Sequence, residues 1–121
     1  MMRGVVSNLQ ALVTIQFVVP DKGSLSIEFV IDTGFTGYLC VPLDLLKQFC
    51  IVSCGDMRVQ LADDSWVVLD LYPARILWHG VEMQIDAIAT GSRPLIGTAL
   101  LDGSRMNTEF RENGPVSLFP L

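Results

Sequence analysis

A pair of strand-like segments joined by a tight turn, residues 11–19 and 25–30, constrains the fold of this chain more than any other feature. The first segment is rich in β-branched residues, and the second places large apolar side chains with a period of two, as strands do. Between them, Pro20-Asp21-Lys22-Gly23 has proline first and glycine last, which is typical of a turn. Together the segments predict a β-hairpin.

Strand signals recur along the rest of the chain. Further strand-like segments are residues 37–41, 57–61, 66–78 and 81–89, and two short strands flank Glu112-Asn113-Gly114-Pro115 in the C-terminal tail. Pro73 interrupts the longest segment, and because proline has no N–H to donate, we expect a bulge or a sheet edge there. No repeat, linker or low-complexity segment divides these strands, so we expect one all-β domain over residues 1–121.

Helical signals are few and short. The segment 42–49 begins with a proline, which suits a first helical turn. It can place three apolar side chains on one face: Leu43, Leu46 and Phe49. Residues 94–103 predict a buried strand that turns at Gly97 into a short helix. One or two short helices are therefore expected beside the strands.

Composition excludes several classes of protein. The 121 residues are 50% apolar and 17% charged, with a net charge of −5, which suits one compact core and argues against disorder. The eight Lys and Arg residues are scattered, which argues against nucleic-acid binding. No apolar run reaches the roughly 20 residues that span a bilayer, and polar residues interrupt the start, which makes it a poor signal peptide. We expect a cytoplasmic protein with no membrane contact.

The cysteines and the single histidine do not form a recognisable metal or hydrolase motif. Cys40, Cys50 and Cys54 are odd in number, and the last two lack the spacing of a short zinc knuckle. Free cysteines commonly serve as small buried hydrophobes, which is the interpretation favoured here. His79 lies in Trp-His-Gly, typical of a turn, without a local Ser or Cys partner for a triad. No metal and no cofactor are expected.

One acidic residue stands at the end of a strongly apolar segment, where Asp32-Thr33-Gly34 follows directly on Phe29-Val30-Ile31. By average composition this tripeptide occurs by chance in about one chain in fifty of this size. In the plainer interpretation, Asp32 accepts backbone hydrogen bonds in a turn and Gly34 supplies an unusual dihedral angle. In the other interpretation, the fold holds a reactive carboxylate at the rim of its core.

A second motif favours the reactive carboxylate. Leu95-Ile96-Gly97, two apolar residues and a glycine before a short helix, lies further along the chain. Together with "IDTGFTGYLCVP", "VQLADDS", "YPARILWHG", "LIGTALL" and "GPVSLFPL", it resembles the retropepsin-like aspartic proteases, in particular their small single-domain bacterial and archaeal members. The resemblance covers nearly the whole chain. It implies an all-β fold, the closed β-barrel of the acid proteases, with one or two short helices.

The resemblance also implies a mechanism. Aspartic proteases hold two carboxylates that share a proton, because like charges about 3 Å apart cannot both ionise cheaply. One acts as general base on a water molecule, and the other donates a hydrogen bond to the scissile carbonyl. This chain has one Asp-Thr-Gly, so the second carboxylate must come from an identical partner. The implied protein is a homodimeric aspartic endopeptidase acting on extended, apolar peptides, with its two-fold axis between the two Asp32 residues.

Further site residues follow from the same resemblance. Thr33 would hydrogen-bond across the axis, and Gly34 would let substrate and water approach closely. Residues 60–66 would form a flap that closes over the peptide. Substrate contacts are expected from Phe35 and from the flap residues Leu61, Ala62, Asp63, Asp64 and Ser65, while Leu95, Ile96 and Gly97 pack behind the catalytic turn. The plainer interpretation of the flap tip is a solvated hairpin turn, and both can hold.

The chain departs from the family pattern around this site. Phe35 replaces the small residue, Ser or Ala, that follows the motif in many relatives, and unlike serine it cannot hydrogen-bond the carboxylate. Thr36 and Thr98 stand where viral relatives pair an Asp with an Arg. The flap tip lacks the glycine-rich run of the viral enzymes, which implies a stiffer or shorter flap.

Two other functions stay open on the sequence alone. In one, the chain keeps the protease fold as a catalytically weak or inactive module that binds peptides or dimerises. In the other, it is a small monomeric β-domain in which Asp32 is only a turn residue.

Overall fold

The computed structural model describes residues 1–121, with 57% of the chain in strands and 8% in helices. The predicted mostly-β architecture with short helices is therefore confirmed. The strands are β1 (Met2–Ser7), β2 (Gln10–Val19), β3 (Gly23–Ile31), β4 (Leu39–Val41), β5 (Gly55–Gln60), β6 (Trp66–Trp78), β7 (Val81–Ala89), β8 (Leu95–Ile96), β9 (Ser104–Thr108) and β10 (Pro115–Pro120). The helices are α1 (Leu43–Gln48) and α2 (Thr98–Leu101).

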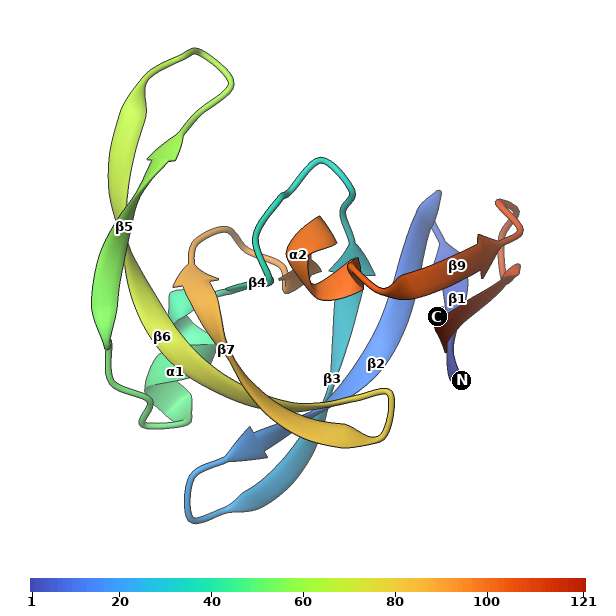
Figure 1. Ribbon diagram of the computed structural model, residues 1–121, viewed down its shortest axis with the longest axis horizontal. Helices are drawn as coiled ribbons and strands as arrows, with labels where there is room; N and C mark the ends of the chain where they lie inside the picture. The colour runs from blue at the N-terminus through green and yellow to red at the C-terminus, as the bar shows by residue number, and fades with distance from the viewer.

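The strands form one sheet that pairs back on itself. Its order is β5-β6-β7-β4-β8-β3-β2-β1-β10-β9, and β6 also pairs with β2. This extra pairing, Phe17 with Ile76 and Val18 with Arg75, links β2, β3, β8, β4, β7 and β6 in a ring. Figure 1 shows the β5–β6 hairpin extending away from the ring as an arm. These pairings show a ring of strands but not a closed barrel, so the expected closed β-barrel stays a prediction.

Turn chemistry explains the hairpin of β2 and β3, which confirms the predicted hairpin, and also the connection between β6 and β7. β2 and β3 pair antiparallel up to Val19 and Gly23, and in the turn between them Asp21 and Gly23 have φ angles of 61° and 82°. β6 and β7 join through His79 and Gly80, whose φ angles are 51° and 78°. Two successive residues with positive φ match the twist of the flanking strands in a two-residue hairpin.

Pro73 lies in β6 where that strand has no neighbour on one side. β5 pairs with β6 only as far as Leu71, and β2 pairs with it at Arg75 and Ile76. Proline is tolerated at such a local edge because no strand there requires its N–H. The predicted sheet edge is confirmed.

Strand β1 is not anticipated by the sequence patterns. Asn8, one of the polar residues that interrupt the apolar start, forms the turn between β1 and β2 together with Leu9, and their φ angles are 51° and 65°. On its other side β1 pairs with β10, with Met2 opposite Leu118. Both ends of the chain therefore lie in the same part of the sheet, as Figure 1 shows.

Helix α1 confirms the predicted helix with one correction. Leu46 and Phe49 are buried, whereas Leu43 is 38% exposed. Steps of three residues drift by about 60° around a helix of 3.6 residues per turn, so Leu43 and Phe49 point about 120° apart. Helix α2 follows β8 as predicted. Neither helix is long and apolar enough to cross a membrane.

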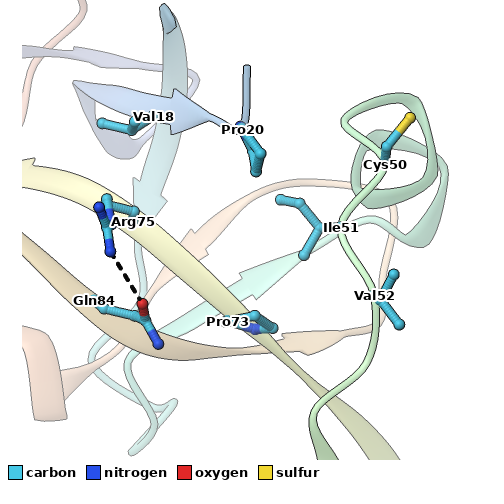
Figure 2. A pocket seen from close by; sticks show the side chains of 8 residues that line it. All are labelled: Val18, Pro20, Cys50, Ile51, Val52, Pro73, Arg75 and Gln84. Carbon is cyan, nitrogen blue, oxygen red and sulfur yellow. Dashed lines mark hydrogen bonds between the residues drawn. The ribbon is translucent and has the colours of Figure 1, made fainter. Parts of the chain in front are cut away.

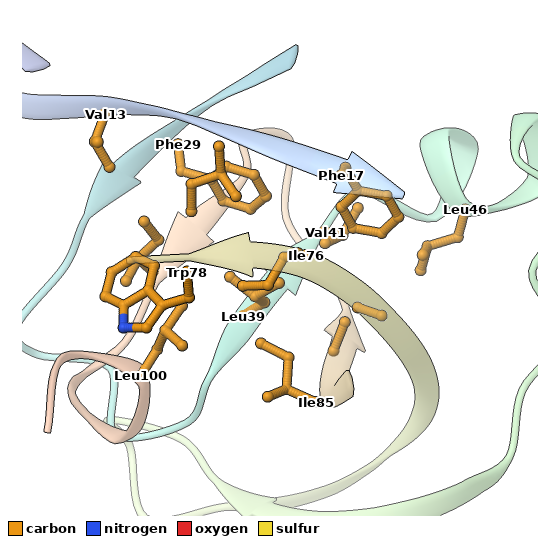
Figure 3. Packing of buried hydrophobic residues seen from close by; sticks show 14 of the residues in the cluster. Val13, Phe17, Phe29, Leu39, Val41, Leu46, Ile76, Trp78, Ile85 and Leu100 are labelled. Atoms are coloured by element: carbon orange, nitrogen blue, oxygen red, sulfur yellow. The ribbon is translucent and has the colours of Figure 1, made fainter. Parts of the chain in front are cut away.

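An apolar cluster of 17 buried residues packs between the strands. Figure 3 shows its side chains converging from several strands and from both helical segments. Phe17, Phe29, Leu39 and Ile76 are among the side chains with no exposed surface. No polar or charged residue is buried, so a functional carboxylate has to stand at the rim of this core.

The burial of Ile76 gives a test of the core. Ile76 is fully buried and faces Phe17 in that pairing, so Ile76→Ala should lower the free energy of unfolding by about 2–5 kcal/mol. Val81→Ala, at a side chain that is 64% exposed, should change it by less than about 0.5 kcal/mol. Urea denaturation at one protein concentration measures both, and equal effects would contradict the assigned core position of Ile76.

Candidate active site

Asp32 is the first residue after β3, and its backbone is fixed by β8. β3 and β8 pair in parallel, with Ile31 opposite Ile96. The Asp32 N–H donates to the Ile96 carbonyl oxygen at 2.9 Å, and the Val30 N–H donates to the Pro94 carbonyl oxygen at 2.9 Å. The side chain of Asp32 is partly exposed. The strand thus carries the carboxylate to the rim of the core and holds its backbone there.

The carboxylate is bonded within its own turn. Gly34 donates its N–H to Asp32 Oδ1 at 2.9 Å, and Phe35 donates its N–H to the Asp32 carbonyl oxygen at 3.1 Å. Gly34 does not have the positive φ that the plain turn interpretation expects, so that expectation is wrong. A Cβ on Gly34 would lie 3.3 Å from Asp32 Oδ1. Glycine therefore suits position 34 because the Asp32 carboxylate lies so close, and not because the backbone needs an unusual dihedral angle.

The loop after Asp32 sits directly on the start of helix α2. A Cβ on Gly97 would lie 2.1 Å from the Gly37 carbonyl oxygen and 2.7 Å from that of Phe35. The Gly97 N–H donates to the Tyr38 carbonyl oxygen at 3.0 Å, and the Thr98 N–H donates to that of Phe35 at 2.8 Å. The structure thus places Leu95-Ile96-Gly97 against the Asp32 turn.

The Phe35 ring packs against Gly37 and Gly97, where the loop meets the start of α2. A Cβ on Gly37 would meet the Phe35 ring at 2.5 Å, and one on Gly97 would meet it at 2.6 Å. The Thr98 hydroxyl also donates to the Phe35 carbonyl oxygen at 3.4 Å. These contacts join the loop to α2. The half-buried ring packs within its own chain, and a contact between Phe35 and substrate stays a prediction.

Cys40 lies beside this turn, in β4. It is buried and pairs with Leu95 of β8. Burial, with the nearby negative charge of Asp32, raises the pKa of the Cys40 thiol from its ordinary value of 9.0 to about 11. Cys50 and Cys54 are free and exposed, so the interpretation as buried hydrophobes is wrong for both. They lie in the segment after α1, outside the core.

The predicted flap is a hairpin of β5 and β6 with a hydrogen-bonded tip. The Leu61 N–H donates to the Ser65 carbonyl oxygen at 2.8 Å. Ser65 donates its hydroxyl and its N–H to Asp63 Oδ1, at 2.5 Å and 3.0 Å. These bonds lower the pKa of the Asp63 carboxyl below its ordinary value. Leu61, Ala62, Asp63, Asp64 and Ser65 are all exposed. The tip is a solvated turn, and its contact with substrate stays a prediction.

Asp32 and Thr33 open into a groove of about 410 Å³. The other lining residues are mainly apolar: Leu9, Gln10, Ala11, Val30, Ile31, Leu95, Met106 and Phe110. The groove brings Asp32, Thr33 and Leu95 together, but none of the flap-tip residues lines it. Sequence reasoning missed Leu9, Met106 and Phe110. The one available signal was Leu9, an apolar residue that directly follows Asn8 in the turn between β1 and β2.

A second cavity of about 450 Å³ lies beside the unpaired stretch of β6. Figure 2 shows its lining residues: Val18, Pro20, Cys50, Ile51, Val52, Pro73, Arg75 and Gln84. The dashed line marks the bond from the Arg75 guanidinium to Gln84 Oε1, at 3.5 Å. None of the candidate site residues lines this cavity. The structure contains no cluster of three or more His, Cys, Asp or Glu side chains that could hold a metal ion.

His79 has a partner that its local sequence does not reveal. Its Nε2 lies 2.8 Å from Ser104 Oγ in β9. Burial, followed by the charge of the N-terminal ammonium, lowers the pKa of His79. Nδ1 is buried without a hydrogen-bond partner, so no carboxylate orients the ring as a triad requires. The contact ties the β6–β7 turn to β9 and does not form a hydrolase site.

Comparison with known proteins supports the fold. No protein-family model and no curated protein matches the sequence. Among solved structures, the chain is similar to a retropepsin-like aspartic protease from Rickettsia conorii, with a TM-score of 0.56 and 13% sequence identity. The match covers 99% of this chain and 90% of that chain. The chain therefore has a fold similar to that of a retropepsin-like aspartic protease over nearly its whole length.

The close contact at Gly97 gives a second test. Gly97→Ala should lower the free energy of unfolding by about 1–3 kcal/mol, because the added methyl group meets backbone atoms that cannot yield easily. Gly55→Ala is the matched control, since a Cβ there meets nothing within 4 Å. It should be neutral or raise stability by up to about 1 kcal/mol. Equal changes in both variants, measured by urea denaturation, would contradict the contact.

The cysteines give a third test, by reaction with a thiol reagent. Cys50 and Cys54 should react rapidly in the native protein, whereas Cys40 should react only on unfolding. Because the native pKa of Cys40 is raised, its protonated thiol is favoured by folding. This contribution to stability is complete below pH 9 and is lost as the pH rises towards 11.

Asp32→Asn should lower the pKa of Cys40, because the negative charge that raises it is removed. A pH titration of the Cys40 thiolate in the two proteins measures this change. An unaltered pKa would mean that the Asp32 carboxylate is not beside the thiol.

Proposed function

We propose that this protein is a homodimeric aspartic endopeptidase that cleaves extended peptide segments. The observation that carries the proposal is the placement of Asp32. Its backbone is bonded to β8 and its Oδ1 to Gly34, at the rim of an apolar core. The fold around it is similar to that of a retropepsin-like aspartic protease. The ring of strands serves, in this proposal, as the closed barrel of that fold.

The chemistry requires two copies of the chain. One Asp32 carboxylate comes from each, and the pair shares one proton because two adjacent like charges cannot both persist. The ionised carboxylate takes a proton from a water molecule, whose oxygen attacks the scissile carbonyl carbon. The protonated carboxyl donates a hydrogen bond to the carbonyl oxygen. The carbon–nitrogen bond of the resulting tetrahedral adduct then breaks, and the carboxyl group that took the proton from the water gives it to the departing amine.

The other site residues have supporting roles in this proposal. Thr33 is exposed beside Asp32 in the groove and hydrogen-bonds across the two-fold axis. Gly34 keeps space free around the carboxylate. The flap, residues 60–66, closes over a peptide held in an extended conformation by main-chain hydrogen bonds. We also propose a cytoplasmic location, where free thiols such as those of Cys50 and Cys54 stay reduced.

Asp32→Asn tests the proposal. It should reduce peptide cleavage by at least about 10²-fold, since the general base is lost, and it should leave the fold and the self-association of the chain unchanged. Asp21→Asn is the matched control: Asp21 is an exposed turn residue with a φ of 61°, a conformation that asparagine also adopts. Cleavage of a peptide library by each variant, followed by mass spectrometry, measures the effect.

Two outcomes would contradict the proposal. If Asp32→Asn cleaves as well as the wild-type protein, Asp32 is not the catalytic group. If the wild-type protein binds extended peptides without cleaving them from acidic to neutral pH, the chain is a peptide-binding module with the protease fold.

A further inference from the structure

We infer that a second copy of this chain docks on an apolar face formed by Leu9, Met106 and Phe110, named here the Leu9–Phe110 face. The inference rests on the proposed function, because that function requires a second Asp32. It goes further by assigning the surface that brings the two carboxylates together.

The groove beside Asp32 sets the location. Asp32 and Thr33 line the same groove as all the residues of the Leu9–Phe110 face. Two Asp32 carboxylates that share a proton stand about 3 Å apart. At that separation, the walls of the groove that contains Asp32 lie next to the partner chain. The Leu9–Phe110 face is the apolar part of those walls.

Leu9 is an outlier that the single chain does not explain. It lies in the β1–β2 turn with a φ of 65° and is 82% exposed. The left-handed conformation is unfavourable for a residue that carries a side chain, and glycine is strongly preferred at such turn positions. Leucine here therefore carries backbone strain and exposes a large apolar side chain. Burial against a second copy would offset both costs.

The Leu9–Phe110 face is held in place before any partner arrives. The Asn8 N–H donates to Glu112 Oε2 at 3.1 Å, which joins the β1–β2 turn to the loop that carries Phe110. The Val6 N–H donates to the Gly114 carbonyl oxygen at 2.9 Å, and the Asn113 N–H donates to that of Val6 at 2.8 Å. Phe110 is 64% exposed on this fixed loop. A preorganised surface loses little conformational freedom on binding.

The charges around the face suit a second copy of the same chain. Its rim carries Arg93, bonded to Gln10, and an Arg111–Glu109 ion pair at 3.7 Å, beside Glu112. The rim thus has two positive and two negative side chains, and Asp32 adds one negative charge within the groove, whereas the whole chain has a net charge of −5. A two-fold interface sets the patch against itself, so a balanced rim permits opposite charges to pair. An apolar centre within a polar rim is also the usual anatomy of an interface.

Sedimentation equilibrium of four proteins tests the inference. The wild-type chain should be a dimer, and Leu9→Asp and Phe110→Asp should each raise the dimer dissociation constant by about 30-fold or more. The control is Val52→Asp, at a side chain that is 78% exposed and lines the other cavity, and it should leave the constant unchanged. If both face variants dissociate no more than the control, the dimer uses another surface and the inference is wrong.

Leu9→Gly separates an interface role from a purely structural one. Glycine relieves the strained turn, so in the Phe110→Asp background Leu9→Gly should keep or raise the free energy of unfolding. In the otherwise wild-type chain it should nevertheless weaken the dimer. A dimer as tight as the wild type would show that Leu9 is not buried by a partner.

Cleavage measurements on the same proteins distinguish failure of the inference from failure of the proposed function. Face variants that stay dimeric but bind peptide more weakly would assign the Leu9–Phe110 face to substrate and overturn the inference alone. Wild-type protein that cleaves peptides as a monomer would overturn the homodimeric mechanism itself. Loss of cleavage in step with loss of dimer supports both.

Discussion

The contact between the Gly97 backbone and the loop after Asp32 is the constraint on which the rest of the site depends. An added Cβ at Gly97 would lie 2.1 Å from the Gly37 carbonyl oxygen, so the two backbones approach as closely as they can. That approach accompanies the bond from the Asp32 N–H to the Ile96 carbonyl oxygen. It fixes one side of the Asp-Thr-Gly turn within the chain and leaves the other side to face the groove.

Two features that the single chain leaves unexplained, the lone carboxylate of Asp32 and the exposed side chain of Leu9, belong to the same groove. Asp32 is one carboxylate of a pair in the proposed mechanism, and Leu9 is an exposed leucine in a strained turn. Both line the groove. One two-fold contact would supply the missing carboxylate and bury the exposed leucine. Cys40 reports on this arrangement from the core side, because its pKa responds to the charge of Asp32.

Local patterns were sufficient to predict most of the fold, because the hairpins are encoded by their own turn residues. Strand β1 was missed because its turn, Asn8-Leu9, lacks the glycine that usually marks one. The motif residues Asp32 and Gly97 could be found by their neighbours in sequence. The reason for glycine at position 97 could not, because it depends on a loop that approaches through long-range packing. Phe110 could not be assigned to the groove from its local sequence, because it comes to line the same groove as Leu9 only through long-range packing.

A crystal structure of the wild-type protein tests the central claim most directly. We expect two copies related by a two-fold axis, with the Asp32 carboxylates about 3 Å apart and Leu9 and Phe110 buried between the chains. Copies that associate through another surface, with their Asp32 side chains apart and exposed, would contradict it.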